Sequence, residues 1–586
     1  MRNPLFYGFG GAGVTPFVGN DGSVMVLRAV RRMWGAPLWA HVLTLLVVLL
    51  VMLPVLDVHW QWSADEGAVL AQAQQLADGG GWRFPVPFPE VDPQGKWFPI
   101  HLSERAADGQ WVSYAKLPLY PVVVSVLLGS LGLPGVVLLG VAGTLVAAVC
   151  AALLVSGSSP GARRSTMWAV GLATPLFFYA YSVIAHSIGA AVVGLAAVGC
   201  QRWCRSGRTP WLLLVAGAVV VAVAVRNEAV LMVAAATFVF CVLAWRRSDR
   251  RLFAAALAVV VPALAMFLVN RVWYSRILDG GGDLRPPSLG EEAGFLASRW
   301  SGLVATTIRS GEHNLLLLAA LVLALAAVLI RRRVASTLVV AGLGVTAMVL
   351  TLVSAVLQPL GNVPGLLLVT PILVAGLLLV VKDDVKGSPG VGLAVFSVFA
   401  LGVLAAQYGV GGAGEWGGRF FAMGLPILVP VAVVALSRTR ATTPETGRIL
   451  VTTIVGMSLI LAGLATATLR NAHELTEQVV TTVAEVAART PAGDGGSPVV
   501  ISTTPAVARL AWRDLPSGRW LLVEEDDLTL PIEQNEAFRR LNEAGVEAVT
   551  VTIVPGYELA DPEGWSLVSK TMTTKGYGAA VYARDG

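Results

Sequence analysis

Long apolar runs dominate this chain of 586 residues and determine the class of fold that it can adopt. A helix that crosses a membrane needs about 20 apolar residues, or about 17 at the short end. Thirteen candidate spans meet this criterion, near residues 36–57, 134–155, 166–182, 186–204, 209–225, 229–245, 252–269, 314–330, 336–357, 365–381, 389–406, 421–437 and 448–468. Only 13% of the residues are charged, against about a quarter in a soluble protein. The sequence therefore predicts a polytopic, mainly α-helical membrane protein.

Basic residues fall in alternate connections between these runs. Short loops rich in arginine and lysine stay in the cytoplasm. With the N-terminus inside, the cytoplasmic connections carry Arg163, Arg164, Arg202, Arg205, Arg208, Arg246, Arg247, Arg250, Arg251, Arg331, Arg332, Arg333, Lys382, Lys386, Arg438, Arg440 and Arg448. A full span at 117–132 would move the later basic loops outside, so we expect that short stretch to dip into the membrane and return. The predicted topology has the N-terminus inside and the C-terminus outside the cytoplasmic membrane.

The N-terminus carries no cleavable signal pattern. Residues 1–24 are glycine-rich, and are either a disordered leader or an extension upstream of a start at Met25. We expect residues 1–35 to form a partly disordered cytoplasmic segment that precedes a transmembrane domain over residues 36–470, with a first external loop at 58–133. The net charge of +5 is small for this length and argues against a nucleic-acid partner.

The composition changes after residue 470. Strands are predicted at 497–502, 518–525 and 547–554, helices at 504–513 and 531–544, and a hairpin within 565–583. This order predicts a small external α/β domain over residues 471–586. It contains no catalytic cluster, so we expect its part from residue 487 onward to fold independently and to influence acceptor choice without taking part in the chemical step.

An adjacent acid pair, Asp65 and Glu66, follows the first apolar run in the stretch "HWQWSADEGAVLAQAQQLADGGGW", residues 59–82. Ser63 and Glu66 have the spacing of a capping box, which predicts the start of an amphipathic helix on the membrane surface. Asp65 would then sit at the positive end of the helix dipole. Because the cap occupies Glu66, Asp65 is the carboxylate left for chemistry.

The first loop resembles that of the GT-C superfamily of membrane glycosyltransferases. The resemblance rests on an apolar first helix, the external "DE", and "KLPLYP" at 116–121 before the next span. The branch with the most similar motifs contains the protein O-mannosyltransferases and lipid A aminoarabinose transferases. The likeness covers residues 36–270 by motif and the whole membrane part by span count. It implies the GT-C fold and transfer of one sugar from a polyprenyl-phosphate donor to an external acceptor.

This resemblance also implies roles for single residues. Asp65 would be the general base that takes the acceptor proton, with Glu66 in support. Lys116 would contact the carrier phosphate, although the family usually has two prolines after this lysine and this chain has Leu117 and Pro118. The alternative for Lys116 is an interfacial side chain that contacts lipid headgroups. Tyr120 is expected to contact sugar or acceptor.

Two further charged stretches are placed on the external side by the predicted topology. The first, "AVRNEAV", holds Arg226 and Glu228 at the end of a span, where an ionisable pair indicates a functional site or a helix-end ion pair. The second, "GEWGGRFF", holds Glu415 and Arg419 and resembles the "GxRY" turn of the superfamily. Arginine can bind phosphate with two nitrogens. We expect Lys116, Arg226 and Arg419 to form the phosphate site, with Glu228 and Glu415 near the sugar or acceptor.

His186 marks a departure from the family pattern. Related proteins often carry a second acid in this external loop, whereas this chain has "YSVIAHSIGAA". His186 is either a contact to donor or acceptor hydroxyls or a capped interfacial residue. The missing acid weakens the case for an acid-coordinated metal, so no cofactor is assigned and a divalent metal stays open.

Two other functions are compatible with a polytopic chain. A lipid-linked sugar transporter or flippase is disfavoured because the spans show no inverted repeat and the ionisable residues gather at one face. A noncatalytic glycan-binding protein would keep the fold without a role for Asp65. The acceptor stays open between protein, glycolipid and cell-wall glycan. High alanine, valine, glycine and arginine content is typical of a high-GC actinobacterium, for which mannose and arabinofuranose donors both stay open.

Overall fold

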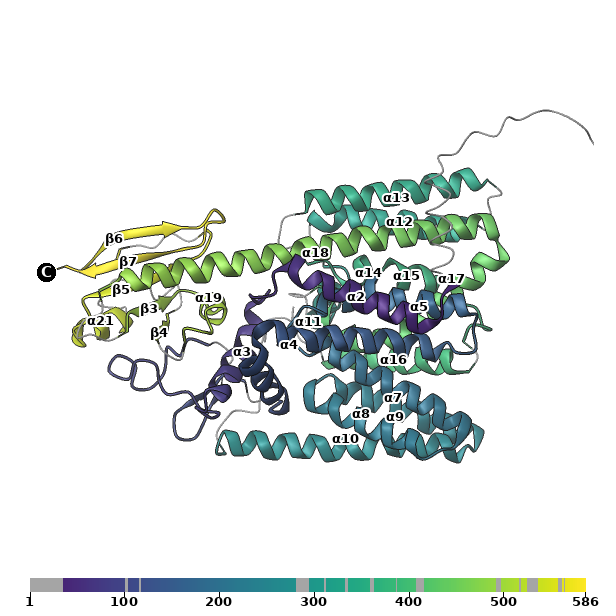
Figure 1. Ribbon diagram of the computed structural model, residues 1–586, viewed down its shortest axis with the longest axis horizontal. Helices are drawn as coiled ribbons and strands as arrows, with labels where there is room; N and C mark the ends of the chain where they lie inside the picture. The colour runs from purple at the N-terminus through teal and green to yellow at the C-terminus, as the bar shows by residue number, and fades with distance from the viewer. Residues whose placement is uncertain are drawn as a thin grey trace, which may run out of the picture.

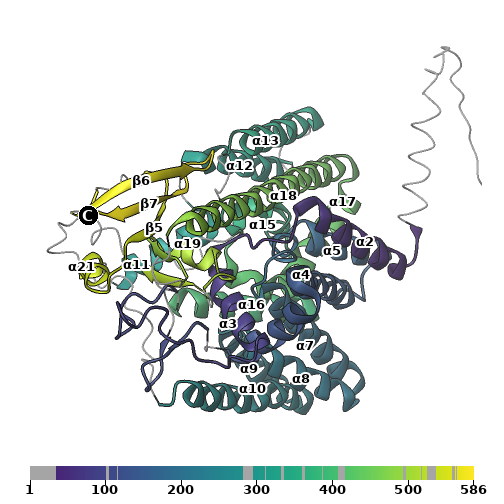
Figure 2. The same cartoon turned by 60° about the vertical axis from the view of Figure 1, so that its left-hand side comes forward.

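The computed structural model describes most of the chain and shows a helical bundle with a strand-containing part at one end (Figure 1). The described residues are 35–100, 104–114, 117–280, 295–309, 312–331, 336–358, 363–385, 387–406, 416–491, 497–515, 518–523, 536–556, 561–562 and 564–585. The helices of the bundle run roughly parallel to one another, and the C-terminal strands lie beyond their ends in both views (Figures 1 and 2).

Ten helices within the described residues are long and apolar enough to cross a membrane. They are α2 (Leu38–Leu56), α4 (Leu119–Leu154), α7 (His186–Ser206), α9 (Ala229–Arg247), α10 (Arg250–Ile277), η1 with α12 (Glu312–Asn314 and Leu315–Ile330), α13 (Thr337–Leu357), α16 (Ser388–Ala406), η2 with α17 (Arg419–Gly424 and Leu425–Thr442) and α18 (Pro444–Arg489). The chain is therefore a multi-pass, mainly helical membrane protein, as its apolar runs predict.

Three of the thirteen predicted spans are shorter helices. The run 209–225 forms α8 (Pro210–Val225). The run 166–182 belongs to two helices, α5 (Pro160–Leu172) and α6 (Leu176–Tyr179). The run 365–381 likewise forms two helices, α14 (Leu366–Val369) and α15 (Pro371–Leu378). Proline lacks a backbone N–H and starts helices readily; Pro175 precedes α6 and Pro371 opens α15. A count of thirteen spans is not confirmed.

Helix α4 is two helical stretches joined by a kink. Gly132 has φ 68° and ψ −169°, a conformation open to glycine and outside the helical region. The stretch before the kink packs on α3 (Ala64–Ala77), where Val124 and Leu70 belong to one buried cluster. The segment predicted to re-enter the membrane is thus helical and packed on α3; its depth in the bilayer stays a prediction. One further helix, α11 (Phe295–Thr307), has no counterpart among the predicted spans.

The C-terminal part is an α/β unit, as its strand and helix pattern predicts. Its elements are β3 (Val499–Ser502), α19 (Pro505–Leu510), β4 (Arg519–Leu522), α21 (Glu536–Glu543), β5 (Ala548–Ile553), β6 (Trp565–Met572) and β7 (Gly578–Arg584). The sheet order is β4-β3-β5-β7-β6, with β4, β3 and β5 parallel and the β6–β7 hairpin antiparallel. Strands β3 and β5 are buried along their whole length, because both faces of the sheet are covered.

Helix α18 connects the bundle to this sheet without a break (Figure 1). Its 46 residues extend about 70 Å at the usual helical rise. The helix passes the compositional change at residue 470 and ends at Arg489. Near its end, Val479 and Val483 pack in one cluster with Val500 of the sheet. The same helix is thus both a candidate span and a covering layer of the C-terminal unit.

The opposite face of the sheet is completed by the long connection between α2 and α4, which also carries the short strands β1 (Glu104–Arg105) and β2 (Trp111–Val112). Phe88 and Trp97 from this connection share a buried cluster with Phe538 of α21. Leu522 N donates a hydrogen bond to Trp97 O at 2.8 Å. The C-terminal unit thus builds its core together with the first loop, which argues against independent folding.

Candidate functional site

Helix α3 begins differently from the predicted capping box. Ser63 is the N-cap residue, but its side chain makes no capping hydrogen bond, and its buried Oγ has no partner among the described residues. Glu66 is fully buried, and its Oε2 accepts a hydrogen bond from Trp62 N at 3.0 Å. Glu66 therefore reaches back one residue beyond the N-cap. The capping-box prediction is wrong in its partners, although Glu66 does close the N-terminal end of the helix.

The second oxygen of Glu66 binds a different part of the chain. Its Oε1 accepts hydrogen bonds from Ser182 Oγ at 2.8 Å and from Val183 N at 2.6 Å, in the connection between α6 and α7. A buried carboxylate needs donors for both oxygens, and these supply them. Glu66 thus joins α3 to the bundle and fixes the position of its neighbour Asp65.

Asp65 lies between two arginine side chains from distant parts of the chain. Its Oδ2 accepts from Arg419 Nη1 at 3.1 Å and its Oδ1 from Arg509 Nη1 at 2.9 Å. The Asp65 side chain keeps 44% of its surface exposed, so it can still reach a ligand. Arg419 opens η2 beside α17, and Arg509 lies in α19 of the C-terminal unit. Arg509 belongs to no motif that points to this site from the sequence.

A close approach of two backbones brings Arg509 to Asp65. A Cβ atom on Gly67 would lie 1.9 Å from the carbonyl oxygen of Arg509, so α3 must have glycine where α19 crosses it. Gln61 Nε2 donates to Leu510 O at 2.7 Å, and Trp512 Nε1 donates to Gln61 Oε1 at 3.1 Å. These contacts fix α19 against the start of α3, whose position at the membrane surface stays a prediction.

Arg226 and Glu228 form a two-pronged ion pair in the turn between α8 and α9. Arg226 Nε lies 3.0 Å from Glu228 Oε2, and Nη2 lies 2.7 Å from Oε1. Both side chains are only 13% exposed. A bidentate geometry of this kind makes a strong charge-assisted contact. The helix-end ion pair proposed as one alternative is therefore present, and it lies at the wall of a cavity.

This cavity of about 250 Å³ brings most of the described candidate residues together. Its polar lining comprises Asp65, Glu104, Ser113, Tyr114, Tyr120, Arg226, Asn227, Glu228, Arg419 and Arg509. Three carboxylates and three guanidinium groups thus face one space between the bundle, the first loop and the C-terminal unit. Guanidinium groups bind phosphate, and a carboxylate can accept a proton, so this lining suits a phosphorylated ligand with a reacting hydroxyl.

Two lining residues were missed by sequence reasoning alongside Arg509. Glu104 comes from the short strand β1 and accepts a hydrogen bond from the Tyr274 hydroxyl of α10. Tyr114 follows β2. Burial raises the pKa of its hydroxyl, and the charge of Glu228 raises this pKa further. The nearby Arg226 and Arg419 lower the same pKa and so partly oppose the shift. Tyr114 therefore stays protonated at neutral pH and can donate a hydrogen bond. The sequence signal for both is weak, because neither belongs to a motif.

His186 lies apart from this lining. It is the first residue of α7 and only 2% exposed, and its ring centroid is 4.4 Å from that of Tyr179. It is not among the residues that the structure places around the cavity. His186 is thus a buried residue at the start of α7, and its contact to donor or acceptor hydroxyls stays a prediction.

Several predicted features lie outside the described residues. Lys116 and Glu415 are both in this category, so their expected roles stay predictions. Among the residues that the structure does describe, no group of three histidine, cysteine, aspartate or glutamate side chains is arranged to hold a metal ion. Binding of a divalent metal therefore stays an open possibility, as it was from the sequence.

The fold and the site together define a multi-pass membrane protein with a charged cavity between its bundle and its C-terminal unit. No family model and no curated protein matches the chain. Among solved structures, it is similar to ArnT from Cupriavidus metallidurans in the apo state, with a TM-score of 0.48, 12% identity, and coverage of 96% of this chain and 98% of that chain. The same protein bound to undecaprenyl phosphate gives a TM-score of 0.41, 15% identity, and coverage of 96% and 98%.

A second similar structure is the apo oligosaccharyltransferase of Archaeoglobus fulgidus. Its TM-score is 0.46 at 11% identity, with 87% of this chain and 69% of that chain covered. These TM-scores lie below 0.5 and the identities are low. The function is therefore inferred from the residues of the site and from the motifs of the first loop.

Proposed function

We propose that this chain is a GT-C-type inverting glycosyltransferase, which transfers a sugar from a polyprenyl-phosphate donor to an acceptor hydroxyl on the outer face of the cytoplasmic membrane. The observation that carries the proposal is the placement of Asp65 beside Arg419 and Arg509 in a cavity that Arg226 also lines. The motifs of the first loop, with their resemblance to this superfamily, point to the same chemistry.

The proposed reaction is a single displacement at the anomeric carbon. The acceptor oxygen forms a bond to that carbon while the bond from carbon to phosphate oxygen breaks, and the bonding electron pair leaves with the polyprenyl phosphate. The acceptor proton passes to Asp65, the general base. Phosphate is a good leaving group, so cations that stabilise its growing charge and one positioned base are sufficient. A single displacement inverts the anomeric configuration.

The two arginine contacts of Asp65 fit this reaction as a binding switch. A donor phosphate entering the cavity competes with the Asp65 carboxylate for the guanidinium groups of Arg419 and Arg509. Binding of the donor then weakens both contacts and leaves the carboxylate available to the acceptor hydroxyl. The base would thus be released when the leaving group is already in place, which disfavours reaction in the absence of donor.

The C-terminal unit has a larger role in this proposal than the sequence suggested. Its Arg509 contacts the proposed base directly, so the unit contributes to the chemical step as well as to any choice of acceptor. Protein, glycolipid and cell-wall glycan acceptors, and hexosyl or pentosyl donors, are all compatible with a cavity of this size and charge.

The direct experiment uses purified full-length protein in vesicles loaded with polyprenyl-phosphate sugars, including mannose and arabinofuranose. A transferase releases polyprenyl phosphate when acceptor is present, and Asp65→Asn should abolish most of that release without abolishing donor binding. A flippase would instead move the intact lipid across the bilayer, and a glycan-binding protein would retain the lipid without cleavage. Either result would overturn the proposal.

A further inference from the structure

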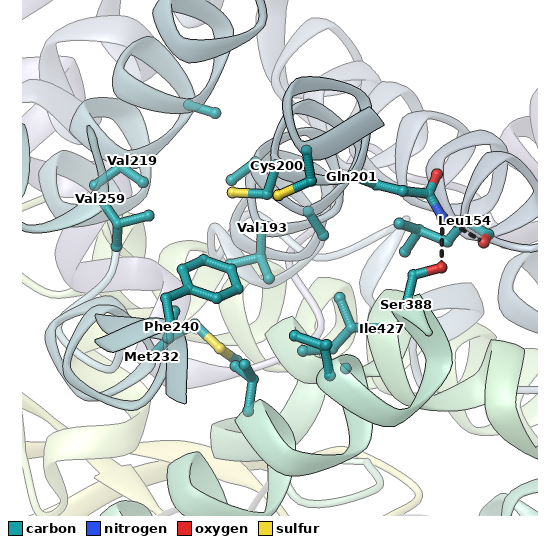
Figure 3. Close-up of a pocket in the computed structure, with 18 of the residues that line it drawn as sticks. Leu154, Val193, Cys200, Gln201, Val219, Met232, Phe240, Val259, Ser388 and Ile427 are labelled. Carbon is teal, nitrogen blue, oxygen red and sulfur yellow. Dashed lines mark hydrogen bonds between the residues drawn. The ribbon is translucent and has the colours of Figure 1, made fainter. Parts of the chain in front are cut away.

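A larger cavity lies inside the bundle, apart from the charged site. It has a volume of about 370 Å³ and is bounded by α7, α8, α9, α10, α16, α17 and the end of α4. Figure 3 shows side chains such as Val193, Met232, Phe240 and Ile427 around it. Most of the lining is aliphatic or aromatic, so the cavity suits an apolar ligand.

The cavity is elongated along the helices. On α7 its lining begins at Val192 and ends at Arg205, and on α9 it begins at Ala229 and ends at Arg247. The α7 stretch corresponds to about 20 Å at the helical rise. One leaflet of the hydrocarbon core is about 15 Å thick, half of the whole. An extended acyl chain therefore matches the cavity in length and in polarity.

The polar end of the cavity is strongly basic. Arg205 and Arg247 lie at its rim together with Asp249, whose carboxylate caps α10 by accepting from Arg251 N at 2.8 Å. This end is opposite the Asp65 cavity, because α7 and α9 both start beside that cavity and run away from it. Four more arginines lie near this end of the cavity, at the ends of α7 and α9 and the start of α10: Arg202, Arg246, Arg250 and Arg251. Clustered arginines next to a membrane surface attract anionic lipid headgroups.

Gln201 is a polar side chain among the apolar residues of the lining. It is 8% exposed and lines the cavity one helical turn before Arg205. Its Nε2 donates to Leu154 O at 2.8 Å and to Ser388 Oγ at 2.7 Å (Figure 3), which fixes the orientation of the amide because Leu154 O can only accept. Its buried Oε1 has no partner among the described residues. Because this oxygen is closed to solvent, a ligand in the open cavity does not reach it, and the Gln201 amide holds α7 against α4 and α16.

We propose that this cavity binds one anionic glycerophospholipid. One acyl chain fills the apolar length of the cavity, and the phosphate lies at Arg205 and Arg247. The site is separate from the Asp65 cavity and does not depend on the proposed transferase activity. Its consequence is that the protein is most stable in membranes that contain such a lipid.

The test is native mass spectrometry of the full-length protein, delipidated and then equilibrated with phosphatidylglycerol, phosphatidylcholine or polyprenyl phosphate. Wild type should retain one phosphatidylglycerol per chain and little phosphatidylcholine. The double variant Arg205→Gln, Arg247→Gln should weaken retention by at least about tenfold, since each charge-assisted contact is worth that much. Ala236→Leu should also reduce retention of phosphatidylglycerol, because the larger side chain narrows the apolar part of the cavity and leaves the arginines at the rim unchanged.

Arg448→Gln is the matched control, because Arg448 is an exposed arginine on α18 that does not line the cavity. Equal losses in this control and in the double variant would mean that the arginines act only through general surface charge, and would overturn the site. Equal retention of phosphatidylcholine, or displacement of phosphatidylglycerol by polyprenyl phosphate from the same site, would overturn the choice of ligand. Wild type that retains no lipid would overturn the proposal as a whole.

Discussion

The Asp65 carboxylate accepts a hydrogen bond from Arg509 at 2.9 Å, across 444 residues of sequence. This contact joins the first loop to the C-terminal unit at the wall of the charged cavity. It makes the proposed base dependent on a part of the protein that carries no catalytic motif of its own.

Replacement of Arg509 by glutamine should lower turnover by about tenfold, because the donor phosphate loses one of the guanidinium groups that it takes over from Asp65. The folded state should lose less than about 1 kcal/mol, since the partner Asp65 is partly exposed. Turnover and unfolding are measured on the same preparation. Arg513→Gln is the control, because Arg513 donates to His59 O and does not contact Asp65. Unchanged or increased turnover in Arg509→Gln would contradict a supporting role.

Gly67→Ala should lower the free energy of unfolding by about 1–3 kcal/mol, the usual cost of overpacking. The added methyl group would overlap the Arg509 carbonyl, so α19 must shift away from α3. Denaturant unfolding of the purified protein measures the change. Gly217→Ala in α8 is the control, since its methyl group would meet no atom within 4 Å. Similar stability in both variants would show that the backbones are not in close contact.

Alanine substitution of Lys116, Arg226 or Arg419 should each weaken donor binding by about tenfold or more. The physical reason is loss of a cation from a site that binds phosphate. Removing Arg226 alone also leaves Glu228 without its bidentate partner, so the double variant Arg226→Ala, Glu228→Ala separates the two effects. Binding of a polyprenyl-phosphate sugar is measured directly. Wild-type affinity in all three single variants would exclude the shared phosphate site.

Reporter fusions placed after Arg208 and after Arg489 should report opposite sides of the membrane. The expectation follows from the distribution of arginine between the apolar runs, which keeps the short basic loops in the cytoplasm. The fusion after Arg208 should be cytoplasmic and the one after Arg489 external. The same location for both fusions would mean that the number of spans between them is wrong by one.

Much of the fold follows from local sequence pattern. Strands β3, β4 and β5, the β6–β7 hairpin and most of the long helices were predicted, because apolar periodicity and length are local properties. The Arg226–Glu228 ion pair was also expected as one alternative, because its two residues lie close together in the sequence. Pro175 interrupts the helix within the run 166–182, although the count of apolar residues predicted one continuous span there.

The site itself depends on contacts that no local pattern contains. The Ser63–Glu66 spacing satisfied the rule for a capping box, yet Glu66 instead accepts from Trp62, Ser182 and Val183. Donors from the distant α6–α7 connection are available only once the chain has folded. Arg509 and Glu104 reach the cavity in the same way, through packing of separate elements.

The central claim is that Asp65 is the base and that Glu66 holds it in place. The most direct measurement is a single-turnover rate with preloaded donor, for Asp65→Asn and Glu66→Gln, on folded protein with donor binding measured separately. Asp65→Asn should lower the rate by about 10²–10⁴, the usual contribution of a general base, with donor affinity retained. Glu66→Gln should reduce stability and cost less in rate. Normal turnover in Asp65→Asn, or a larger loss in Glu66→Gln, would contradict the account.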